Sequence, residues 1–498
     1  MSTTPPSQLQ TLLQAHAPQP LQNWIDHTHI QCGAEIQNEN PPDPESHTKS
    51  DKFLPVTSPH DGRVVSYVPL SGEGDVRRAV ESAGRAWEGW SNRTVKDRVQ
   101  ILMNFHQLVI KHADELADLI VLEHGKNRAE ALAEIAKGNE TVEYAISLPQ
   151  LIQGKILEVS RGVHCHDVRK PLGVVASVVP FNFPFMVPMW TLPIAIATGN
   201  TMVLKPSEKV PLTMSRVMEL LRDAGLPKGV VNLVHGTAEA VNHLIDHPDV
   251  KAVTFVGTTR IAEIVSKRCR NLNKRVIALG GAKNHLVSSP DCNIEMAAAD
   301  IVNSFSGCSG QRCMAASVLL TIGSQHDLLD LIVRKASQLT PGSAPGHVGP
   351  VIDSNSQEKI LRYINEAEQH GAKVLLDGRG WAKERKEGWW VGPTVLVHTD
   401  KGDQALRDEI FGPVLSVLEC GTKEEAVKIE NGNEYGNAGG LFLIALWFDC
   451  DMLHGLILGA LRCLVACIYT QNGGVAEWFT KRFSAGMIGV NIGVPVPR

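Results

Sequence analysis

The sequence lacks several features that mark large classes of protein. Its 498 residues carry a net charge of only −5, so no excess of one sign points to a nucleic-acid partner. Its ten cysteines follow no repeated spacing, which argues against a disulfide framework and against a zinc site. These absences favour an ordinary globular protein of a reducing compartment, with no bound metal.

The N-terminal region lacks a clear targeting signal. It has no charged head followed by an apolar core, as a secretory signal would have. Its first arginine is Arg63, whereas a mitochondrial transit peptide is rich in arginine, so a cytoplasmic location is favoured over a mitochondrial one. Residues 1–52 are rich in Pro, Gln, His and Asn, and we expect an N-terminal extension that behaves as a mobile arm.

The hydrophobic pattern after residue 52 is that of packed α/β domains. Helical periodicity fills residues 75–146, and the alternating residues 155–168 predict a hairpin or arm. Short β-branched segments then alternate with helical ones, which is typical of a doubly wound parallel sheet. The predicted strands are Gly173–Val179, Thr201–Leu204, Val230–Leu233 and Ala252–Val256, and a second α/β unit is expected from Ile277 to Glu419.

One segment near the C-terminus does not fit this pattern. Leu443–Tyr469 is almost wholly apolar, and its length would span a bilayer. Asp449, Asp451 and Arg462 within it would be costly at membrane depth. A buried or misplaced segment is therefore favoured over a membrane span, and we expect no membrane association.

Cys313 is the first candidate for chemistry. It lies in the fragment SGQRCM, where two nearby glycines supply a loop and Arg312 supplies an adjacent positive charge. A nucleophilic cysteine needs a loop, partial access and a positive environment that favours the thiolate. The alternative is an inert buried thiol, which is the commonest state of a free cysteine.

Other candidates follow the predicted strands, where ligands gather in doubly wound sheets. Asn182, in PFNFP, is a rigid amide donor that could stabilise an oxyanion or bond its own turn. Lys205 and Glu208, in KPSE, could bind ribose hydroxyls or form an incidental ion pair. Gly257 and Thr258, in FVGTT, could bring helix N-terminal amides to a phosphate or merely cap the helix. The sequence has no G-x-G-x-x-G fingerprint.

Six fragments occur in one order along the chain: PFNFP, KPSE, FVGTT, LGGAKNH, SGQRCM and EIFGPV. Together they resemble the aldehyde dehydrogenase superfamily, and GAKNH and GQRCMAAS are similar to its CoA-acylating methylmalonate-semialdehyde dehydrogenase branch. The resemblance extends from about Phe53 to Phe442 and resumes at Thr470. It implies a three-part α/β architecture: an NAD-binding domain of residues 53–147 and 170–279, a catalytic domain of residues 280–483, and a small β oligomerisation arm of residues 148–169 and 484–498.

The resemblance also implies a role for each matched residue. Cys313 would attack the aldehyde and form a thioester, while Asn182 and the Cys313 backbone N–H would hold the oxyanion. NAD would accept the hydride. The NAD-binding residues would be Lys205 and Glu208 at the adenosine ribose, Gly257 and Thr258 at the pyrophosphate, and Glu409 at the nicotinamide ribose. Taken alone, Glu409 would be interpreted as a solvated surface acid.

The fate of the thioester is predicted from an absence. Hydrolytic members of the family carry a water-activating glutamate at the position that Leu279 occupies here. Leucine cannot take a proton, whereas a CoA thiol is a better nucleophile than water and needs less help. We therefore expect CoA as a co-substrate. Hydrolysis without CoA, assisted by another base such as a histidine, is the alternative.

The resemblance implies a short semialdehyde substrate, with malonate or methylmalonate semialdehyde converted to acetyl-CoA or propionyl-CoA. In this branch two arginines bind the substrate carboxylate, because a guanidinium holds it bidentately. Arg312 matches one of them, and Lys137 stands in place of the other. Lysine keeps the charge but not the fork, so a different short semialdehyde or an uncharged aldehyde is also open.

Two departures from the family concern the C-terminal part. The family pattern would pass from residues 436–442 directly to Thr470, so we interpret Leu443–Tyr469 as an aberrant insertion from a retained intron or a gene-model error. The chain also ends at Arg498, earlier than such enzymes usually end, and the shortened tail would belong to the oligomerisation arm. A homodimer or homotetramer is expected with an intact tail. An inactive or misfolded isoform is the alternative to an enzyme.

Overall fold

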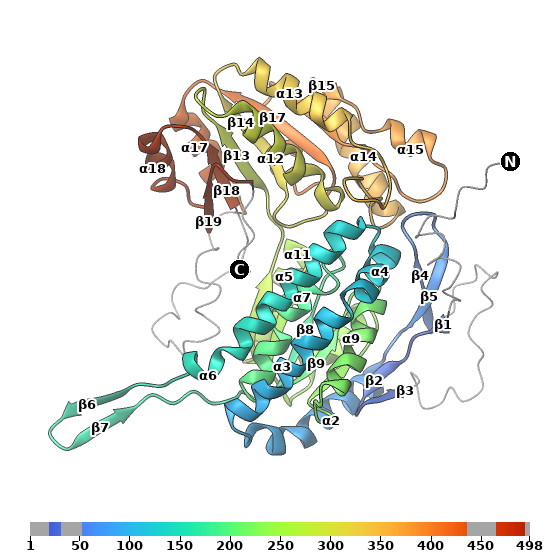
Figure 1. The fold of residues 1–498 in the computed structure, drawn as a ribbon, viewed down its shortest axis with the longest axis vertical. Helices are drawn as coiled ribbons and strands as arrows, with labels where there is room; N and C mark the ends of the chain where they lie inside the picture. Colours follow the sequence, from blue (N-terminus) through green and yellow to red (C-terminus); the bar gives the residue numbers. More distant parts are fainter. Residues whose placement is uncertain (1–18, 31–51, 436–464, 494–498) are drawn as a thin grey trace.

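The computed structural model describes residues 19–30, 52–435 and 465–493 (Figure 1). Two seven-stranded sheets, each covered by helices, form two domains, and a two-stranded hairpin projects from the first of them. A third sheet has the strand order β1-β5-β4, with β1 (Gln19–Pro20), β4 (Phe53–Thr57) and β5 (Val64–Pro69). This architecture confirms the predicted α/β fold.

The first sheet has the strand order β12-β11-β8-β9-β10-β2-β3. Its first five strands are parallel, and every residue of β8 and β9 is buried, as expected for strands covered on both faces. These strands are β8 (Val174–Val178), β9 (Thr201–Lys205), β10 (Val231–Leu233), β11 (Val250–Val256) and β12 (Arg275–Leu279). The four strands predicted in this region are therefore confirmed.

Helices cover both faces of the first sheet (Figure 1). The region predicted to be helical contains α2 (Glu73–Ser91), α3 (Val95–Lys111), α4 (Ala113–His124) and α5 (Arg128–Ile146), followed by α6 (Leu148–Leu151), α7 (Met186–Met189), α8 (Leu192–Ala197), α9 (Leu212–Asp223), α10 (Ala238–Asp246) and α11 (Thr259–Asn271). A capping box starts α5: the Asn127 side chain accepts from the Glu130 N–H, and the Glu130 side chain accepts from the Asn127 N–H. This cap fixes the position of the first turn of α5.

Residues 19–30 correct the prediction that the whole of residues 1–52 forms a mobile arm. β2 (Asn23–Ile25) pairs antiparallel with β10, and β3 (Thr28–Ile30) pairs with β2 at the edge of the first sheet. Trp24 and Ile25 are only 2% and 3% exposed, so this short strand completes the core despite its polar surroundings in the sequence. The remainder of the predicted arm, residues 1–18 and 31–51, lies outside the described residues.

The predicted hairpin is present. β6 (Ile156–Ser160) and β7 (Val163–His166) pair with each other and project away from both domains (Figure 1). All their residues are exposed, including Ile156 at 70% and Leu157 at 64%. Exposed apolar side chains on an isolated hairpin indicate a surface for contact with another chain. The homodimer or homotetramer stays a prediction.

The second sheet has the strand order β15-β16-β17-β14-β13-β18-β19, and all its neighbouring strands are parallel except the β15–β16 pair. Its strands are β13 (Asn284–Ser288), β14 (Ala316–Ile322), β15 (Lys373–Leu376), β16 (Thr394–His398), β17 (Val414–Cys420), β18 (Val465–Tyr469) and β19 (Met487–Val490). The helices of this domain are α12 (Ile294–Ser306), α13 (His326–Ser337), α14 (Ser354–Gln369), α15 (Gly380–Glu384), α16 (Gln404–Arg407), α17 (Lys423–Asn431) and α18 (Gly473–Thr480).

β18 is the last part of the apolar segment Leu443–Tyr469. It pairs in parallel with β13 on one side and with β19 on the other, and all five of its residues are 0% exposed. Whatever the origin of the segment, Val465–Tyr469 is therefore an inner strand of the second sheet. Residues 443–464 lie outside the described residues. No helix in the described ranges is both long and apolar enough to cross a membrane.

β19 corrects the predicted boundary of the oligomerisation arm. Residues 484–498 were expected to join the hairpin, but Met487–Val490 form the edge strand of the second sheet. Each residue of β19 pairs with one residue of β18, from Val465 with Met487 to Ile468 with Val490. The strand has its hydrogen-bonding partner within the second domain, so it belongs to that domain.

Candidate active site

The fold brings the predicted site residues of the first domain to one edge of its sheet. β8, β9, β11 and β12 are parallel, and β8 lies between β9 and β11, so their carboxyl ends lie side by side. Asn182 follows β8, Lys205 ends β9, Gly257 and Thr258 follow β11, and Leu279 ends β12. This edge is where doubly wound sheets bind their ligands.

Lys205 and Glu208 lie next to each other at this edge. The Lys205 ammonium donates to the Gly236 carbonyl at 2.8 Å and to the Glu208 carboxylate at 3.2 Å. Burial lowers the pKa of Lys205, and the nearby Glu208 opposes this shift. The lysine is only 4% exposed, which does not match a solvated loop with an incidental ion pair. A donor and an acceptor held side by side can bind neighbouring ribose hydroxyls.

The start of α11 is tied to the loop after β12. Thr258 occupies the N-cap position, but its side chain makes no capping hydrogen bond. Instead, Thr259 Oγ1 accepts a hydrogen bond from the Gly281 N–H at 3.0 Å. A larger residue could replace Gly257 only if its neighbours moved, because a Cβ there would lie 2.6 Å from the Phe255 ring. The positive end of the α11 dipole is thus held at the ligand-binding edge.

Glu409 is not a solvated surface acid. Its carboxylate accepts a hydrogen bond from the Ala282 N–H at 3.2 Å, and a Cβ on Gly281 would lie 2.2 Å from its Oε2. Burial raises the pKa of Glu409, while the Ala282 N–H and two lysines oppose the shift. Phe411, with a φ of 59°, packs edge-on against Phe181 with the ring centroids 5.9 Å apart. The Glu409 loop of the second domain therefore contacts the PFNFP loop of the first.

Cys313 ends a tight loop that follows α12. The loop begins with a 3₁₀ turn over Gly307–Gly310, in which Cys308 and Ser309 have φ angles of 50° and 56°. Cys313 is half-buried, whereas the other described cysteines are either buried or, on the hairpin, exposed. Burial also raises the pKa of Cys308 to about 11, so that neighbour stays a thiol. Cys313 is therefore the cysteine of this loop whose access suits a nucleophile.

Asn284 is a residue of this site that the sequence analysis missed. Its Nδ2 donates to the carbonyls of Cys313 and Ala315, both at 2.8 Å, and its Oδ1 accepts from the Val465 N–H at 2.9 Å. Asn284 is 1% exposed. One buried amide thus links the backbone of the predicted nucleophile to the first residue of β18. Its position in the LGGAKNH fragment was the feature of the sequence that could have identified it as a site residue.

The Arg312 guanidinium lies at the C-terminal end of α12. Its Nη2 donates to the carbonyls of Asn303 at 2.8 Å and Ser304 at 3.1 Å, while its Nε is buried with no partner among the described residues. The side chain also lines a narrow crevice together with Lys283 and Glu409. Arg312 therefore caps α12 and still has a donor without a partner, and its role as a carboxylate clamp stays a prediction.

Lys137 lies on α5. It forms an ion pair with Glu140, with 2.8 Å between Nζ and Oε2, in which the two side chains are 22% and 45% exposed. A surface pair of this kind contributes at most about 1 kcal/mol to stability, so a substrate carboxylate could replace Glu140. The predicted role of Lys137 at the substrate is not tested by this contact.

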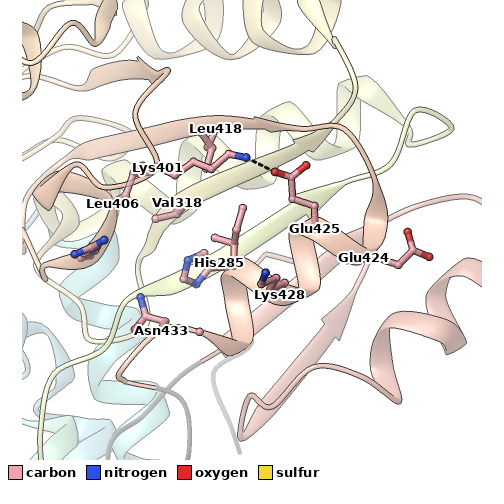
Figure 2. A pocket seen from close by; sticks show the side chains of 12 residues that line it. His285, Val318, Lys401, Leu406, Leu418, Glu424, Glu425, Lys428 and Asn433 are labelled. Carbon is pink, nitrogen blue, oxygen red and sulfur yellow. Dashed lines mark hydrogen bonds and ion pairs between the residues drawn. The ribbon is translucent and has the colours of Figure 1, made fainter.

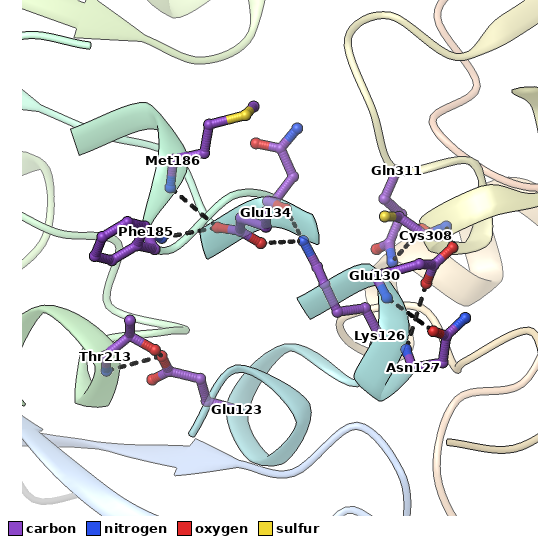
Figure 3. Close-up of polar contacts among 11 residues, drawn as sticks. Glu123, Lys126, Asn127, Glu130, Glu134, Phe185, Met186, Thr213, Cys308 and Gln311 are labelled. Atoms are coloured by element: carbon purple, nitrogen blue, oxygen red, sulfur yellow. Dashed lines mark hydrogen bonds and ion pairs between the residues drawn. The ribbon is translucent and has the colours of Figure 1, made fainter. Parts of the chain in front are cut away.

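Asn182 is held by residues that the sequence analysis also missed. It is 5% exposed, and its backbone carbonyl accepts a hydrogen bond from Lys126 Nζ at 2.9 Å. Lys126 in turn forms a buried ion pair with Glu134, with 2.5 Å between Nζ and Oε2 (Figure 3). No local pattern marks these two residues as members of the site, because only the fold brings them to the PFNFP loop.

Lys283 carries a buried amine beside Glu409. The residue is 0% exposed, and its Nζ has no hydrogen-bond partner among the described residues. Burial lowers the pKa of Lys283 from 10.5 to about 7, although the Glu409 carboxylate opposes this shift. Between about pH 7 and pH 10 the unfolded chain therefore binds a proton at this residue that the folded chain does not.

Replacing Lys283 with methionine tests this difference in proton binding. In the parent protein this group makes the free energy of unfolding fall as the pH is lowered from about 10 to about 7, because only the unfolded chain gains the proton. Lys283→Met removes that contribution. We expect the variant to have a higher free energy of unfolding than the parent at pH 7. The difference between the two free energies, measured by urea unfolding, should become smaller by pH 10. A gap that does not change with pH would contradict the buried neutral amine.

A larger cavity lies away from these residues. It has a volume of about 590 Å³ and lies between α17 and the second sheet (Figure 2). Its lining includes His285, Lys401, Arg407, Glu425 and Lys428, and none of the predicted site residues. Lys401 and Glu425 form an ion pair across it (Figure 2). The candidate site is therefore identified by its side chains and loops rather than by cavity size.

Comparisons with known proteins agree with this arrangement. The aldehyde dehydrogenase family profile matches residues 46–443. A malonate-semialdehyde dehydrogenase of Oceanobacillus iheyensis is 41% identical over 462 residues, which cover 90% of this chain and 88% of that protein. A second malonate-semialdehyde dehydrogenase, from Geobacillus thermodenitrificans, is 40% identical over 455 residues, with the same shares of the two chains covered.

Solved structures give the same result. The crystal structure of methylmalonate-semialdehyde dehydrogenase from Oceanimonas doudoroffii superposes with a TM-score of 0.85 at 34% identity, covering 96% of this chain and 91% of that one. A Sinorhizobium meliloti protein solved with NAD superposes with a TM-score of 0.86 at 32% identity, covering 97% and 91%. Fold, site and comparisons together define an oxidoreductase that acts on aldehydes. The chain belongs to the aldehyde dehydrogenase family.

Proposed function

We propose that this protein oxidises a short semialdehyde with NAD and transfers the acyl group to CoA. The observation that carries the proposal is the contact between the nucleophile loop and the Glu409 loop. A Cβ on Gly310 would lie 2.0 Å from the Gly412 carbonyl, so these two loops touch directly. Cys313 therefore lies beside the loop that would hold the nicotinamide ribose.

The residues present fit NAD. Lys205 and Glu208 offer a donor and an acceptor for the adenosine ribose, and the start of α11 offers positive charge for the pyrophosphate. Glu409 offers a carboxylate acceptor, and Gly281 leaves no side chain beside it. When bound, NAD would supply the acceptor for the hydride that leaves the substrate. The Sinorhizobium meliloti neighbour solved with NAD supports this cofactor.

The chain's own residues would carry the remaining steps. The Cys313 thiolate would attack the aldehyde carbon, forming a C–S bond and turning the carbonyl oxygen into an oxyanion. The Asn182 amide and the Cys313 N–H would donate hydrogen bonds to that oxyanion. When the C=O bond re-forms, the hydride leaves and a thioester remains on Cys313. A CoA thiolate would then attack the thioester carbon and release the Cys313 thiolate.

Water is disfavoured as the acyl acceptor because the site lacks a base to activate it. Leu279, in place of the glutamate of hydrolytic relatives, is 5% exposed at the end of β12. The histidine next to the PFNFP loop is not placed to take over this role. His124 stacks on Phe181 but is 0% exposed, and burial holds its pKa well below its usual value. A histidine without access to solvent cannot activate a water molecule from it.

A carboxylate-bearing substrate is supported by two cations. Arg312 lies next to Cys313 and lines the crevice that Lys283 and Glu409 also line, and Lys137 is paired only at the surface with Glu140. The relatives named malonate-semialdehyde dehydrogenase share this substrate class. We propose malonate or methylmalonate semialdehyde, with acetyl-CoA or propionyl-CoA as the product. The C–C bond to the carboxyl group would break with release of CO₂, and its electron pair would take up a proton at the carbon next to the thioester.

Turnover is expected to depend on CoA. With aldehyde and NAD alone, each active subunit should form about one NADH and then stop, because the thioester has no base-assisted route to hydrolysis. Addition of CoA should raise the steady rate by at least about 100-fold, which is the usual effect of supplying or removing one proton-transfer route. Absorbance of NADH with and without CoA measures both phases. Equal steady rates would mean that the enzyme is hydrolytic.

The position of Leu279 offers a matched control. Leu279→Glu restores a carboxylate where hydrolytic relatives carry one, and Leu279→Gln has nearly the same shape without a base. We expect the glutamate variant to show a higher CoA-independent rate than the glutamine variant. Equal rates in two folded variants would mean that the residue at this position does not decide the fate of the thioester.

A further inference from the structure

Lys126 and Glu134 form a deeply buried ion pair next to the loop of the proposed oxyanion donor. Their side chains are 0% and 1% exposed, and Nζ and Oε2 are 2.5 Å apart. A buried ion pair is expensive to desolvate, and replacing both partners with neutral groups is often neutral or stabilising. Stability alone therefore does not explain the pair.

The hydrogen bonds of the pair converge on one loop. Glu134 Oε1 accepts from the Phe185 N–H at 2.8 Å and from the Met186 N–H at 3.2 Å, at the start of α7 (Figure 3). Lys126 Nζ donates to the Asn182 carbonyl at 2.9 Å. The same ammonium lies 4.4 Å from the Phe183 ring centroid. Between them, the two side chains contact four of the five residues from 182 to 186.

The Lys126 side chain keeps its positive charge. Burial alone would lower the pKa of Lys126, but the Glu134 carboxylate and other nearby acidic groups raise it above the usual value. A charged ammonium makes a stronger hydrogen bond to a carbonyl than a neutral amine does. The Asn182 backbone is therefore held by a charge-assisted bond inside the protein.

The same helix also holds the nucleophile loop. Glu130, in the first turn of α5, accepts a hydrogen bond from the Cys308 N–H at 2.7 Å (Figure 3). Cys308 belongs to the tight turn with positive φ that leads to Cys313. α5 and the Lys126 segment before it thus contact both the loop of the proposed oxyanion donor and the loop of the nucleophile.

We propose that Lys126 and Glu134 are positioning residues that set the Asn182 amide at its working distance from Cys313. This inference rests on the proposed function, in which Asn182 holds the oxyanion. The pair fixes the backbone of residues 182–186 to α5, and Glu130 fixes Cys308 to the same helix. A shift of about 1 Å in such a donor can lower the rate about 100-fold.

The test replaces both charges together. Lys126→Met combined with Glu134→Gln removes the ion pair without leaving one charge unpaired, so the unfolding temperature should stay close to that of the parent. Because the bond to the Asn182 carbonyl is lost, kcat should fall about 10- to 100-fold while KM changes little. The rate of Cys313 alkylation by iodoacetamide should stay within about twofold, because the nucleophile loop keeps its own anchor. An unchanged kcat in the folded double variant would overturn the inference.

Glu123 provides a matched control. It is another fully buried glutamate, and it accepts hydrogen bonds from Thr213 (Figure 3) and from the Leu212 N–H at the start of α9 rather than from the PFNFP loop. Glu123→Gln is expected to change the unfolding temperature but not kcat. A fall in kcat as large as that of the double variant would show a general response to losing a buried acid.

A double-mutant cycle with Asn182→Ala separates this inference from the proposed function. If the pair acts through Asn182, adding its two substitutions to Asn182→Ala should cost no further rate; multiplied losses would place its action elsewhere. A fully active Asn182→Ala would overturn both the oxyanion role and this inference. A slow Asn182→Ala beside a fully active pair variant would overturn only the inference. If the double variant does not fold, Lys126→Met alone carries the same comparison, because it removes the bond to the Asn182 carbonyl while Glu134 keeps its two backbone N–H donors.

Discussion

Cys313→Ala is expected to lower aldehyde-dependent NADH formation by at least about 10⁴-fold, because alanine cannot form the thioester through which the reaction passes. The fold should be unaffected, since Cys313 is half-buried and its contact with Asn284 is made by the backbone carbonyl. Purified parent and variant are compared by NADH absorbance and by unfolding temperature. If the Cys313→Ala variant kept the rate of the parent, Cys313 could not be the nucleophile.

Alkylation provides an independent check on the nucleophile. Cys165, on β7, is exposed and will also react with iodoacetamide, so the experiment is done in a Cys165→Ala background. This substitution on the hairpin should leave turnover unchanged and therefore also serves as the control cysteine variant. Peptide mapping should find label on Cys313, and aldehyde should slow the labelling. Rapid labelling of Cys313 with no loss of NADH formation would contradict the proposed mechanism.

The parts of the fold that could be predicted are those with a local signal. Short, mostly apolar strands such as Val174–Val178 and Thr201–Lys205 are marked by their own residues, and parallel strands then place the loops after them at one edge. Asn182 and Lys205 could therefore be assigned to a common site before the structure was known. The motifs identified the candidate residues, and the predicted parallel sheet indicated that these residues lie close together.

The parts that could not be predicted depend on distant partners. Asn284 contacts Cys313 and Val465, which are 29 and 181 residues away in the chain. Lys126 meets Asn182 across 56 residues. A buried polar side chain must find hydrogen-bond partners, but its own sequence neighbourhood does not say which ones. Residues that act by holding other residues were missed for this reason.

Trp24 shows the same limit in the core. Composition describes an average over a stretch, and the polar average of residues 1–52 concealed the three-residue strand Asn23–Ile25. Two apolar side chains are enough to fix such a strand when an exposed sheet edge is available for pairing. A free sheet edge exists only in the folded protein. The sequence of the strand that pairs with it therefore does not predict the pairing.

The position of β18 in the second sheet leads to the other large prediction. Two segments have the length and place in sequence to occupy it: Val465–Tyr469, which does so, and Ala438–Phe442, which the family pattern joins directly to Thr470. Deletion of residues 438–464 keeps the first segment, and deletion of residues 443–469 keeps the second. The two deletions have equal lengths and leave five residues between Asn437 and Thr470. We expect both proteins to be soluble and to unfold cooperatively.

The two deletion variants should differ in stability in a predictable direction. Ala438–Phe442 contains two glycines, each of which weakens a strand by about 0.5–1 kcal/mol and leaves less side chain to pack. Against this, Phe442 would replace Tyr469, whose buried hydroxyl has no partner among the described residues and costs about 1–3 kcal/mol. Smaller side chains would replace Val465, Ala466 and Cys467, and we expect this loss of packing to outweigh the gain at Tyr469. The variant that keeps Val465–Tyr469 should therefore have the higher unfolding temperature.

Removal of both segments, residues 438–469, is expected to abolish the fold of the second domain. β18 separates β13 from β19 and buries Val465, Ile468 and Tyr469 completely. Each such side chain contributes about 1.5–3 kcal/mol, and together they approach the whole stability of a typical domain. The Asn284 amide would also lose its Val465 partner, and with it one fixed point of the Cys313 loop. Soluble expression and NADH formation measure the outcome: a fully active protein without either segment would show that this strand is dispensable.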